Sequence, residues 1–186
     1  MPKVLVPLAD GSEEMEAVII IDTLRRAGFS VTSASLGTSR TLTASRGVVL
    51  VADELWESVT PETFDAIVLP GGADGTAAMI ACPGLLNAIQ WFVKAGKLIG
   101  AICAAPLALQ SAGVLEGRHV TCHPAVAESL TQAARSTKRV VQDGNLITSQ
   151  GPGTAFEFAL AVITKLEGQP VADSVEAGLI LPARVT

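Results

Sequence analysis

The sequence predicts a single three-layer α/β domain over residues 1–186, with a largely parallel sheet between two layers of helices. Short apolar runs typical of buried strands alternate with stretches of helical length. Hydrophobic residues make up 49% of the 186 residues, enough for a sizeable core, and no repeat, linker or low-complexity segment divides the chain. Aromatic residues make up only 4%, so the core must consist mainly of aliphatic side chains.

The first half of the chain contains three strand-like runs, a hairpin pattern and two helical stretches. Asp10-Gly11-Ser12 is a turn in which Asp10 or Ser12 can cap the next helix, and Gly28 is a typical helix stop. Pro83 suits a first helical turn. We therefore expect strands over residues 4–9, 29–36 and 65–69, a hairpin over 40–43 and 48–52, and helices over 13–27 and 83–94.

The second half alternates in the same way. Asp143-Gly144 is a hairpin signal, and Thr154 followed by Glu157 fits a capping box. Pro124 suits the start of another helix. We expect strands over residues 97–102 and 120–122, a hairpin over 139–142 and 145–149, and helices over 104–111, 124–134 and 155–166.

Three features lie directly after predicted strands. Glu16 is in the helix after the first strand, Gly71-Gly72 follows the run ending at Pro70, and Cys103 follows the run 97–102. In open α/β sheets, ligands bind in the crevice beyond the carboxyl ends of the strands. We therefore expect Glu16, Gly72 and Cys103 to converge on one site.

Cys103 has the local setting of a nucleophile. It stands between a strand and a helix, and its neighbours Ala101, Ala104 and Ala105 are small enough for a tight turn. Backbone N–H groups at a helix start favour the thiolate. The alternative is a buried structural cysteine. Cys82 and Cys122 lack such a setting, and we interpret them as packing or surface residues.

Glu16 lies in an apolar stretch, Met15 to Ile21. Burial there would raise its pKa and leave it a proton to donate to or share with Cys103. The alternative is a solvated carboxylate in the first helical turn, as we expect for Glu13 and Glu14. From the residue pattern alone, this alternative is favoured for any single Glu here.

Backbone donors and a histidine complete the candidate site. Gly72 and Ala104 can each supply an N–H group to an oxyanion, although a Gly-Gly pair also suits a simple turn. His123 follows the strand 120–122 and faces the crevice or serves a structural role. Gly151-Pro152-Gly153-Thr154 binds an anion or only caps a helix.

Composition and motifs argue against several classes. The net charge is −5 without a Lys/Arg cluster, so we expect no nucleic-acid or membrane partner. Three cysteines without C-x-x-C spacing argue against a disulfide framework and a zinc site, and no nucleotide-binding glycine motif occurs, so we expect no metal and no cofactor. No signal peptide or membrane-spanning run is evident, which favours the cytoplasm.

The predicted helix 13–27 is apolar on more than one face. At about 100° per residue, its apolar side chains cannot all point into one core. A surplus apolar face needs a partner, so we expect a homodimer. The side chains concerned are Ala17, Val18, Ile19, Ile20, Ile21 and Leu24.

Taken together, these segments resemble the ThiJ/PfpI superfamily, on the branch of the parkinsonism-associated deglycase and the bacterial YajL chaperone. The resemblance runs nearly from end to end. It is carried by ordered blocks: Ala9 to Glu16, Leu24 to Gly28, Val68 to Gly72, Ala101 to Ala104, Thr121 to Pro124, and Thr148 to Thr154 with Glu157 to Leu160.

The resemblance implies a flavodoxin-like sandwich that is usually homodimeric. It makes Cys103 the nucleophile, Glu16 its protonated partner and His123 a nearby auxiliary, with Gly72 and Ala104 as backbone donors. Arg26 and Arg46 match positions near the site at the dimer interface, where they can bind an anion. Peptidase relatives carry His directly after the cysteine, where this chain has Ala104, and amidotransferase relatives carry a later His, so both activities are disfavoured.

Two functions follow as expectations. The first is a cofactor-independent glyoxalase or protein deglycase that acts on small 2-oxoaldehydes such as methylglyoxal, or on glycated substrates, and yields 2-hydroxy acids in carbonyl and oxidative stress defence. The second is a redox-sensing chaperone that is signalled by oxidation of Cys103 to a sulfinic acid.

Overall fold

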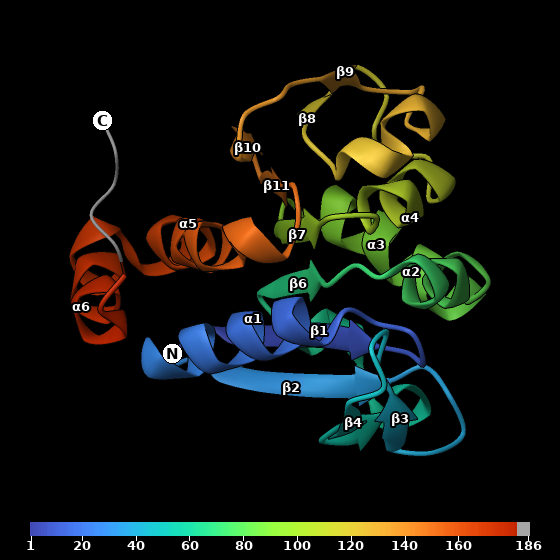
Figure 1. Ribbon diagram of the computed structural model, residues 1–186, viewed down its shortest axis with the longest axis horizontal. Helices are drawn as coiled ribbons and strands as arrows, with labels where there is room; N and C mark the ends of the chain where they lie inside the picture. The colour runs from blue at the N-terminus through green and yellow to red at the C-terminus, as the bar shows by residue number, and fades with distance from the viewer. Residues whose placement is uncertain (182–186) are drawn as a thin grey trace.

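The computed structural model describes residues 1–181, and its centre is a seven-stranded sheet in the order β10-β11-β7-β6-β1-β2-β5 (Figure 1). All neighbouring strands in this sheet are parallel except β10 and β11, which form an antiparallel hairpin. The strands are β1 (Lys3–Leu8), β2 (Ser30–Ser35), β5 (Glu54–Leu55), β6 (Ala66–Leu69), β7 (Leu98–Ile102), β10 (Val140–Asp143) and β11 (Leu146–Ser149).

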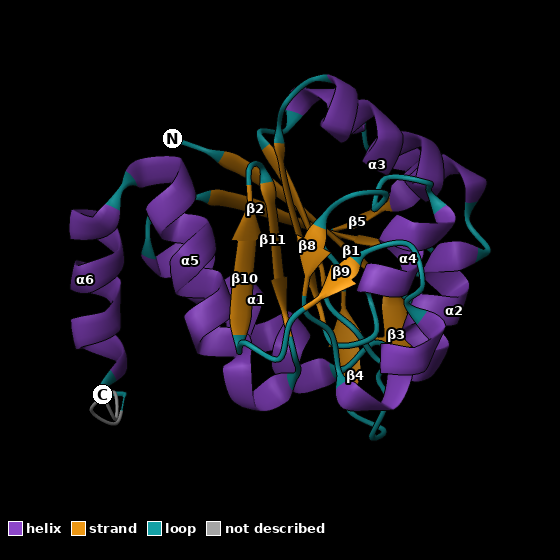
Figure 2. Ribbon diagram, turned by 90° about the horizontal axis from the view of Figure 1, so that it is seen from above, coloured by secondary structure: helices purple, strands orange, loops and turns teal. Residues whose placement is uncertain are grey.

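Helices cover both faces of this sheet (Figure 2). One layer holds α1 (Glu14–Arg26), α5 (Ala155–Glu167) and α6 (Gln169–Leu179). The other holds α2 (Ala73–Ile80), α3 (Pro83–Lys94) and α4 (Pro106–Ser111). The predicted three-layer α/β architecture with a mostly parallel sheet is confirmed.

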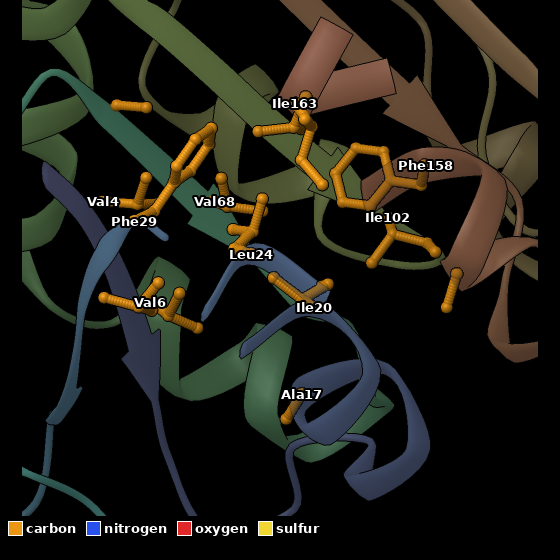
Figure 3. Close-up of a cluster of buried hydrophobic side chains, with 14 of the residues drawn as sticks. Val4, Val6, Ala17, Ile20, Leu24, Phe29, Val68, Ile102, Phe158 and Ile163 are labelled. Atoms are coloured by element: carbon orange, nitrogen blue, oxygen red, sulfur yellow. The ribbon is translucent and has the colours of Figure 1, made fainter. Parts of the chain in front are cut away.

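Each layer has its own apolar core. On the α1 and α5 side, Ile20, Phe158 and Ile163 pack over the sheet together with Val6 and Ile102 (Figure 3). The central strands are buried on both faces, which explains their continuous apolar sequences.

Gly100 in β7 permits the close packing of α5. A Cβ atom there would lie 2.9 Å from Cζ of Phe158 and 3.1 Å from Cγ1 of Val68, so only glycine leaves room for the aromatic ring.

Two small sheets lie outside the main one. Strands β3 (Thr41–Thr43) and β4 (Val49–Val51) form the antiparallel hairpin that the sequence predicts. Strands β8 (His119–Val120) and β9 (Ala134–Arg135) pair in parallel.

The sheet order explains where a ligand would bind. Strand β1 lies between β2 and β6, so the chain runs to opposite sides after β1, and the carboxyl ends of β1, β6 and β7 lie next to one another. Such a point of reversal leaves a crevice at the carboxyl edge. Gly72 and Cys103 lie directly after β6 and β7, and Glu16 lies in the first turn of α1, the helix that follows β1.

The structure contradicts the predicted helix 124–134. Residues Pro124–Ser129 form only a 3-10 helix, and the chain then returns to pair as β9. The cause is a tertiary contact, because Oε1 of Gln110 accepts hydrogen bonds from the N–H groups of Thr131 (2.7 Å) and Gln132 (3.1 Å). Those bonds draw the chain away from a continuing helix.

The predicted capping box at the start of α5 is also wrong. Thr154 is the N-cap residue, but its Oγ1 accepts a hydrogen bond from the N–H of Gly151 and not from within the helix. The Glu157 carboxylate instead forms an ion pair with Arg139 at 2.9 Å. Helices α2 and α6 were not predicted from the sequence at all.

Within residues 1–181, no single helix is long and apolar enough to cross a membrane. Helices α2 and α3 reach that length and apolar character only when taken together, and they are bent by 82° relative to each other.

Candidate active site

The loop between β1 and α1 brings Glu16 to the carboxyl edge of the sheet. Glu13, not the predicted Asp10 or Ser12, caps α1, because its Oε2 accepts from the N–H of Glu16 at 2.7 Å. Ser12 instead accepts from the N–H of Ala9 at 3.0 Å, and Asp10 accepts from the N–H of Thr43 at 2.7 Å. These bonds stiffen the turn that precedes Glu16.

Glu16 is fully buried, so the expectation of a solvated first-turn carboxylate is wrong for this residue. Its Oε2 accepts a hydrogen bond from the N–H of Gly71 at 2.7 Å. Its Oε1 accepts no hydrogen bond within the described residues, and the carboxyl group interacts with the thiol of Cys103. The carboxyl group is therefore anchored by Gly71 at Oε2 and lies close enough to Cys103 to interact with its thiol.

Cys103 lies in a strained turn directly after β7. Its φ of 64° is in the left-handed region, which is uncommon for a residue with a side chain. The main chain is fixed on both sides: its N–H donates to the carbonyl of Ser149 at 3.0 Å, and its carbonyl accepts from the N–H of His123 at 2.9 Å. The half-buried thiol thus projects from a rigid turn, as the nucleophile-elbow pattern predicts.

The helix that follows Cys103 starts later and is shorter than the sequence predicts. Helix α4 begins at Pro106 and has six residues, whereas we expected residue 104 as its start. The dipole of so short a helix contributes little to stabilising a thiolate at Cys103, because the effect of a helix dipole falls off within the first turn. The individual N–H groups of Gly72 and Ala104, which form hydrogen bonds with the thiol of Cys103, are the relevant donors.

Gly71 and Gly72 pack too closely for any side chain. A Cβ atom at Gly71 would lie 2.6 Å from Cβ of Cys103 and 2.9 Å from Oε2 of Glu16, so both functional side chains flank this glycine. A Cβ atom at Gly72 would lie 2.2 Å from the carbonyl oxygen of Gly11, and the φ of Gly72 is +95°. The structure therefore brings Glu16, Gly72 and Cys103 together.

Buried Glu16 and half-buried Cys103 influence each other's pKa. Burial raises the pKa of Glu16 to about 7, although hydrogen bonds from Gly71 and Cys103 oppose the rise. Burial, and then the negative charge of ionised Glu16, raise the pKa of Cys103 to about 12, while the N–H groups of Gly72 and Ala104 lower it. A proton on Glu16 removes the charge that opposes thiolate formation, so the pair favours one shared proton over two negative charges.

The buried carboxyl group makes the stability of the protein depend on pH. The pKa of Glu16 is raised from 4.5 to about 7, so its stabilising contribution is complete below about pH 4.5 and is lost as the pH rises through 7. At 1.36 kcal/mol per pKa unit, we expect the wild-type protein to lose about 3 kcal/mol relative to Glu16→Gln over this range.

Urea unfolding at about pH 5 and about pH 8 measures this difference, with linear extrapolation to water. Glu128→Gln is the control, because the side chain of Glu128 is 99% exposed and should show no such change. A difference between wild type and Glu16→Gln that is independent of pH would contradict the raised pKa.

His123 lies next to this site. Its N–H donates to Cys103, and its ring Cδ2 lies 3.3 Å from the position of a Cβ atom at Gly151. The ring Nδ1 accepts from the N–H of Ala125 at 3.1 Å, so the neutral imidazole carries its proton on Nε2. His123 thus offers a hydrogen-bond donor.

The two candidate arginines do not join the site within this chain. Arg26 is the last residue of α1, ten residues after Glu16 and therefore about 15 Å along the helix axis, and its Nε donates to Asp22 at 2.6 Å. Arg46 is exposed in the turn between β3 and β4. Within the described residues, neither side chain forms a hydrogen bond or ion pair with Cys103, so an anion-binding role for them is a proposal that requires a second chain.

Sequence reasoning missed two contributors to the site. Gly71 anchors Glu16 by its N–H group, and Ser149 at the end of β11 holds the N–H of Cys103. The Gly-Gly pair after a strand signalled the first, but the second depends on the pairing of β7 with β11. In the described part of the chain, no three His, Cys, Asp or Glu side chains are grouped to hold a metal ion.

The fold and the site define an α/β protein with a cysteine at a strained strand-to-helix turn beside a buried carboxyl group. The model of the DJ-1/PfpI family matches residues 2–165, and the chain belongs to this family. This confirms the resemblance found in the sequence.

Relatives support the assignment. The chain is 48% identical over 169 residues to protein DJ-1 homolog B of Arabidopsis thaliana, covering 90% of this chain and 39% of that protein. It is 38% identical to the glutathione-independent glyoxalase DJR-1.2 of Caenorhabditis elegans, covering 96% of this chain and 95% of that protein. The chain spans about two fifths of the length of the two Arabidopsis relatives, with 39% and 43% covered.

A solved structure agrees with the fold. Oxidized DJ-1 of Toxoplasma gondii superposes with a TM-score of 0.93 at 40% identity, covering 97% of this chain and 98% of that chain.

Proposed function

We propose that this protein is a cofactor-independent, cysteine-dependent glyoxalase or protein deglycase for methylglyoxal-type 2-oxoaldehydes or their adducts. The observation that carries the proposal is the buried Glu16 carboxyl group directed at the thiol of Cys103, with the N–H groups of Gly72 and Ala104 beside it. The Caenorhabditis elegans relative is named a glutathione-independent glyoxalase, which supports this reaction class.

The geometry supports a stepwise mechanism. The sulfur of Cys103 attacks the aldehyde carbon, and its electron pair forms the C–S bond while the carbonyl oxygen becomes an oxyanion. The N–H groups of Gly72 and Ala104 stabilise that charge, and Glu16 donates its proton to give a hemithioacetal.

Glu16, now a carboxylate, acts next as the base. It removes the proton from the former aldehyde carbon to form an enediolate, the hydroxyl proton moves from the first oxygen to the second, and Glu16 returns its proton to the neighbouring carbon. The product is a thioester of the 2-hydroxy acid on Cys103. Water hydrolyses this thioester, releases the 2-hydroxy acid and restores the thiol, so the net reaction is the addition of one water.

His123 supports the same reaction as a donor. Because its Nδ1 accepts from Ala125, the Nε2–H group can hydrogen-bond the ketone oxygen of the substrate while the enediol forms. A pKa near 7 at Glu16 suits a group that must both give and take a proton near neutral pH.

Purified protein incubated with methylglyoxal in the absence of glutathione tests the function. Formation of lactate supports the proposal. No lactate above the uncatalysed rate, with a folded protein, would rule it out.

A second candidate function is that of a redox-sensing chaperone, for which oxidation of Cys103 is the signal. The structure of oxidized DJ-1 of Toxoplasma gondii favours this candidate, because it shows that a relative 40% identical to this chain is found in an oxidised form. A sulfinate on Cys103 could accept hydrogen bonds from protonated Glu16 and from the backbone N–H groups.

We expect mild peroxide to convert Cys103 to a sulfinic acid before Cys82 or Cys122 reacts. The thiolate is the species that oxidises, and only Cys103 has both a carboxyl partner and backbone donors. Cys122 is only 3% exposed, so its sulfur is shielded from peroxide, whereas the thiol of Cys103 is half-buried. Peptide mass spectrometry after graded peroxide measures the order, and oxygen gained first at Cys82 or Cys122 would refute it.

We further propose that the protein is a homodimer through α1 and the β3–β4 hairpin. Large apolar side chains are exposed there: Met15 (56%) and Val18 (50%) on α1, and Val49 (61%) and Val51 (65%) on β4. Val18, Ile21, Leu50 and Val51 also line a cavity of about 280 Å³ between these elements. A second copy would cover this face and bring Arg26 and Arg46 to a shared interface.

Light scattering tests the dimer. At micromolar concentration we expect twice the chain mass of 19.1 kDa for the wild type, and a shift toward the single-chain mass for Val51→Lys, because a buried lysine is costly at an apolar interface. Ile180→Lys is the control, since Ile180 is 89% exposed and follows α6, away from the hairpin (Figure 1). A wild-type species of 19.1 kDa alone would refute the proposal.

We also propose that residues 1–186 act as one domain in the cytoplasm. The assignment to one domain is supported by the central sheet, which contains strands from both halves of the chain. Three free cysteines fit a reducing compartment.

A further inference from the structure

The turn between β1 and α1, residues 10–14, lies between two other segments. On one side is the β3–β4 hairpin, which is not part of the main sheet. On the other side is the Gly71–Gly72 loop, whose N–H groups hold Glu16 and Cys103. The turn 10–14 therefore connects an exposed hairpin to the reactive thiol.

The hairpin is attached to this turn by hydrogen bonds through the main chain. The N–H of Gly11 donates to the carbonyl of Thr43 at 2.8 Å, and the N–H of Ser45 donates to the carbonyl of Ser12 at 2.9 Å. The side chain of Asp10 adds a bond from the N–H of Thr43 at 2.7 Å. These bonds attach the end of β3 to the turn 10–14, but they do not involve the hairpin turn at Arg46.

Glu14 holds that turn. Its side chain is buried, with 7% of the residue exposed, so the expectation of a solvated Glu14 is wrong, and each carboxylate oxygen accepts a hydrogen bond from the hairpin turn. Ser45 Oγ donates to Oε2 at 2.7 Å, and the N–H of Arg46 donates to Oε1 at 2.8 Å. Burial raises the pKa of Glu14, but hydrogen bonds from its own N–H group, Ser45 and Arg46 outweigh burial and hold the pKa below its ordinary value.

The opposite side of the turn touches the site without any free space. The N–H of Glu13 donates to the carbonyl of Gly71 at 2.9 Å. A Cβ atom at Gly72 would lie 2.2 Å from the carbonyl oxygen of Gly11 and 2.7 Å from the nitrogen of Glu13. Backbone rests on backbone here, so a displacement of the turn must displace the N–H group of Gly72.

We propose that Glu14 is a positioning residue for Cys103: by clamping Ser45 and Arg46 it fixes the turn 10–14, and through that turn the Gly72 N–H group that the thiol requires. The inference rests on the proposed role of Cys103 as the reactive thiol. Glu14 does not touch the thiol or the substrate, and it acts only through the placement of Gly72.

The chemistry of the clamp requires a carboxylate. Two donors approach two different oxygens, and a glutamine offers only one acceptor oxygen. Glu14→Gln therefore keeps the size of the side chain but leaves Ser45 or Arg46 without its acceptor. Ser45→Ala removes only one of the two bonds and is the milder variant.

Alkylation of each cysteine by iodoacetamide, followed by peptide mass spectrometry across neutral to alkaline pH, tests the proposal. We expect Glu14→Gln to lower the rate constant for alkylation of Cys103 by about tenfold, because the displaced N–H group of Gly72 no longer stabilises the thiolate. For the same reason, the pH profile of alkylation should shift toward higher pH. Ser45→Ala should lower this rate constant by less. In the variant that carries both substitutions, the loss of reactivity at Cys103 should not exceed the sum of the two separate losses, expressed as free energies.

Asp143→Asn is the matched control. Asp143 also accepts a backbone N–H, that of His119 at 2.7 Å, but on β10 at the other end of the sheet. Its loss should leave the alkylation of Cys103 unchanged. The rate at buried Cys122 serves as an internal measure of general loosening.

The outcomes separate this inference from the proposed function. A wild-type Cys103 that reacts no faster than Cys82 overturns the role of Cys103 itself. A reactive wild-type Cys103 with an equal rate in Glu14→Gln overturns the positioning role alone, as does a loss accompanied by faster alkylation of Cys122. If Glu14→Gln does not fold, Ser45→Ala decides by the same criteria.

Discussion

Cys103→Ala is expected to abolish the conversion of methylglyoxal to lactate and to leave the fold intact. Without the sulfur no hemithioacetal forms, so turnover should fall by at least about 1,000-fold. The thiol is half-buried and its loss removes one atom, so the melting temperature should change little. Lactate formation and circular dichroism measure the two effects.

Cys82→Ala is the control for this variant. Cys82 is also partly exposed, but it precedes α3 and has neither a carboxyl partner nor a positive φ. We expect full activity. Equal turnover by Cys103→Ala, or loss of turnover in Cys82→Ala, would contradict the assignment of the nucleophile.

Gly72→Ala is expected to cause the largest loss of stability among single methyl additions. The new Cβ atom would lie 2.2 Å from the carbonyl oxygen of Gly11 and 2.7 Å from the nitrogen of Glu13, and neither backbone atom can yield easily. The φ of +95° adds conformational strain. Together these effects should cost at least about 3 kcal/mol, and the displaced N–H group should also slow Cys103.

Gly28→Ala is the control that separates the backbone strain of a positive φ from the steric clash of the new Cβ atom. Gly28 has a φ of +80° and no atom within 4 Å of a new Cβ, so only the conformational term remains, about 1 kcal/mol. Urea unfolding of both variants measures the difference. A loss in Gly72→Ala no larger than in Gly28→Ala would mean that the loop moves freely, and the tight packing of the turn 10–14 against Gly72 would be wrong.

The strands and the central site residues could be predicted because local sequence determines them. The run Ala66–Leu69 is continuously apolar, as a strand buried on both faces must be, and the strands place Glu16, Gly72 and Cys103 at one edge. These parts of the prediction needed no knowledge of distant contacts.

The sequence-based prediction fails where contacts between segments far apart in the chain determine the local structure. Helix α2 contains Gly75, which weakens its helical signal, yet Gly75 is needed because a Cβ atom there would lie 2.7 Å from the backbone of Ser12. The helix predicted at 124–134 fails because Gln110 binds the chain from another element. The burial of Glu16 and the clamp at Glu14 likewise depend on contacts with segments far along the chain.

The backbone conformation of Cys103 sets stability and chemistry against each other. At a φ of 64°, a glycine would relax the turn at no steric cost, whereas every other residue retains the strain. Selection for thermostability alone would therefore favour glycine at this position, at the expense of the reactive thiol. A laboratory evolution campaign on this protein should score activity together with heat resistance, because the two criteria diverge at its most important residue.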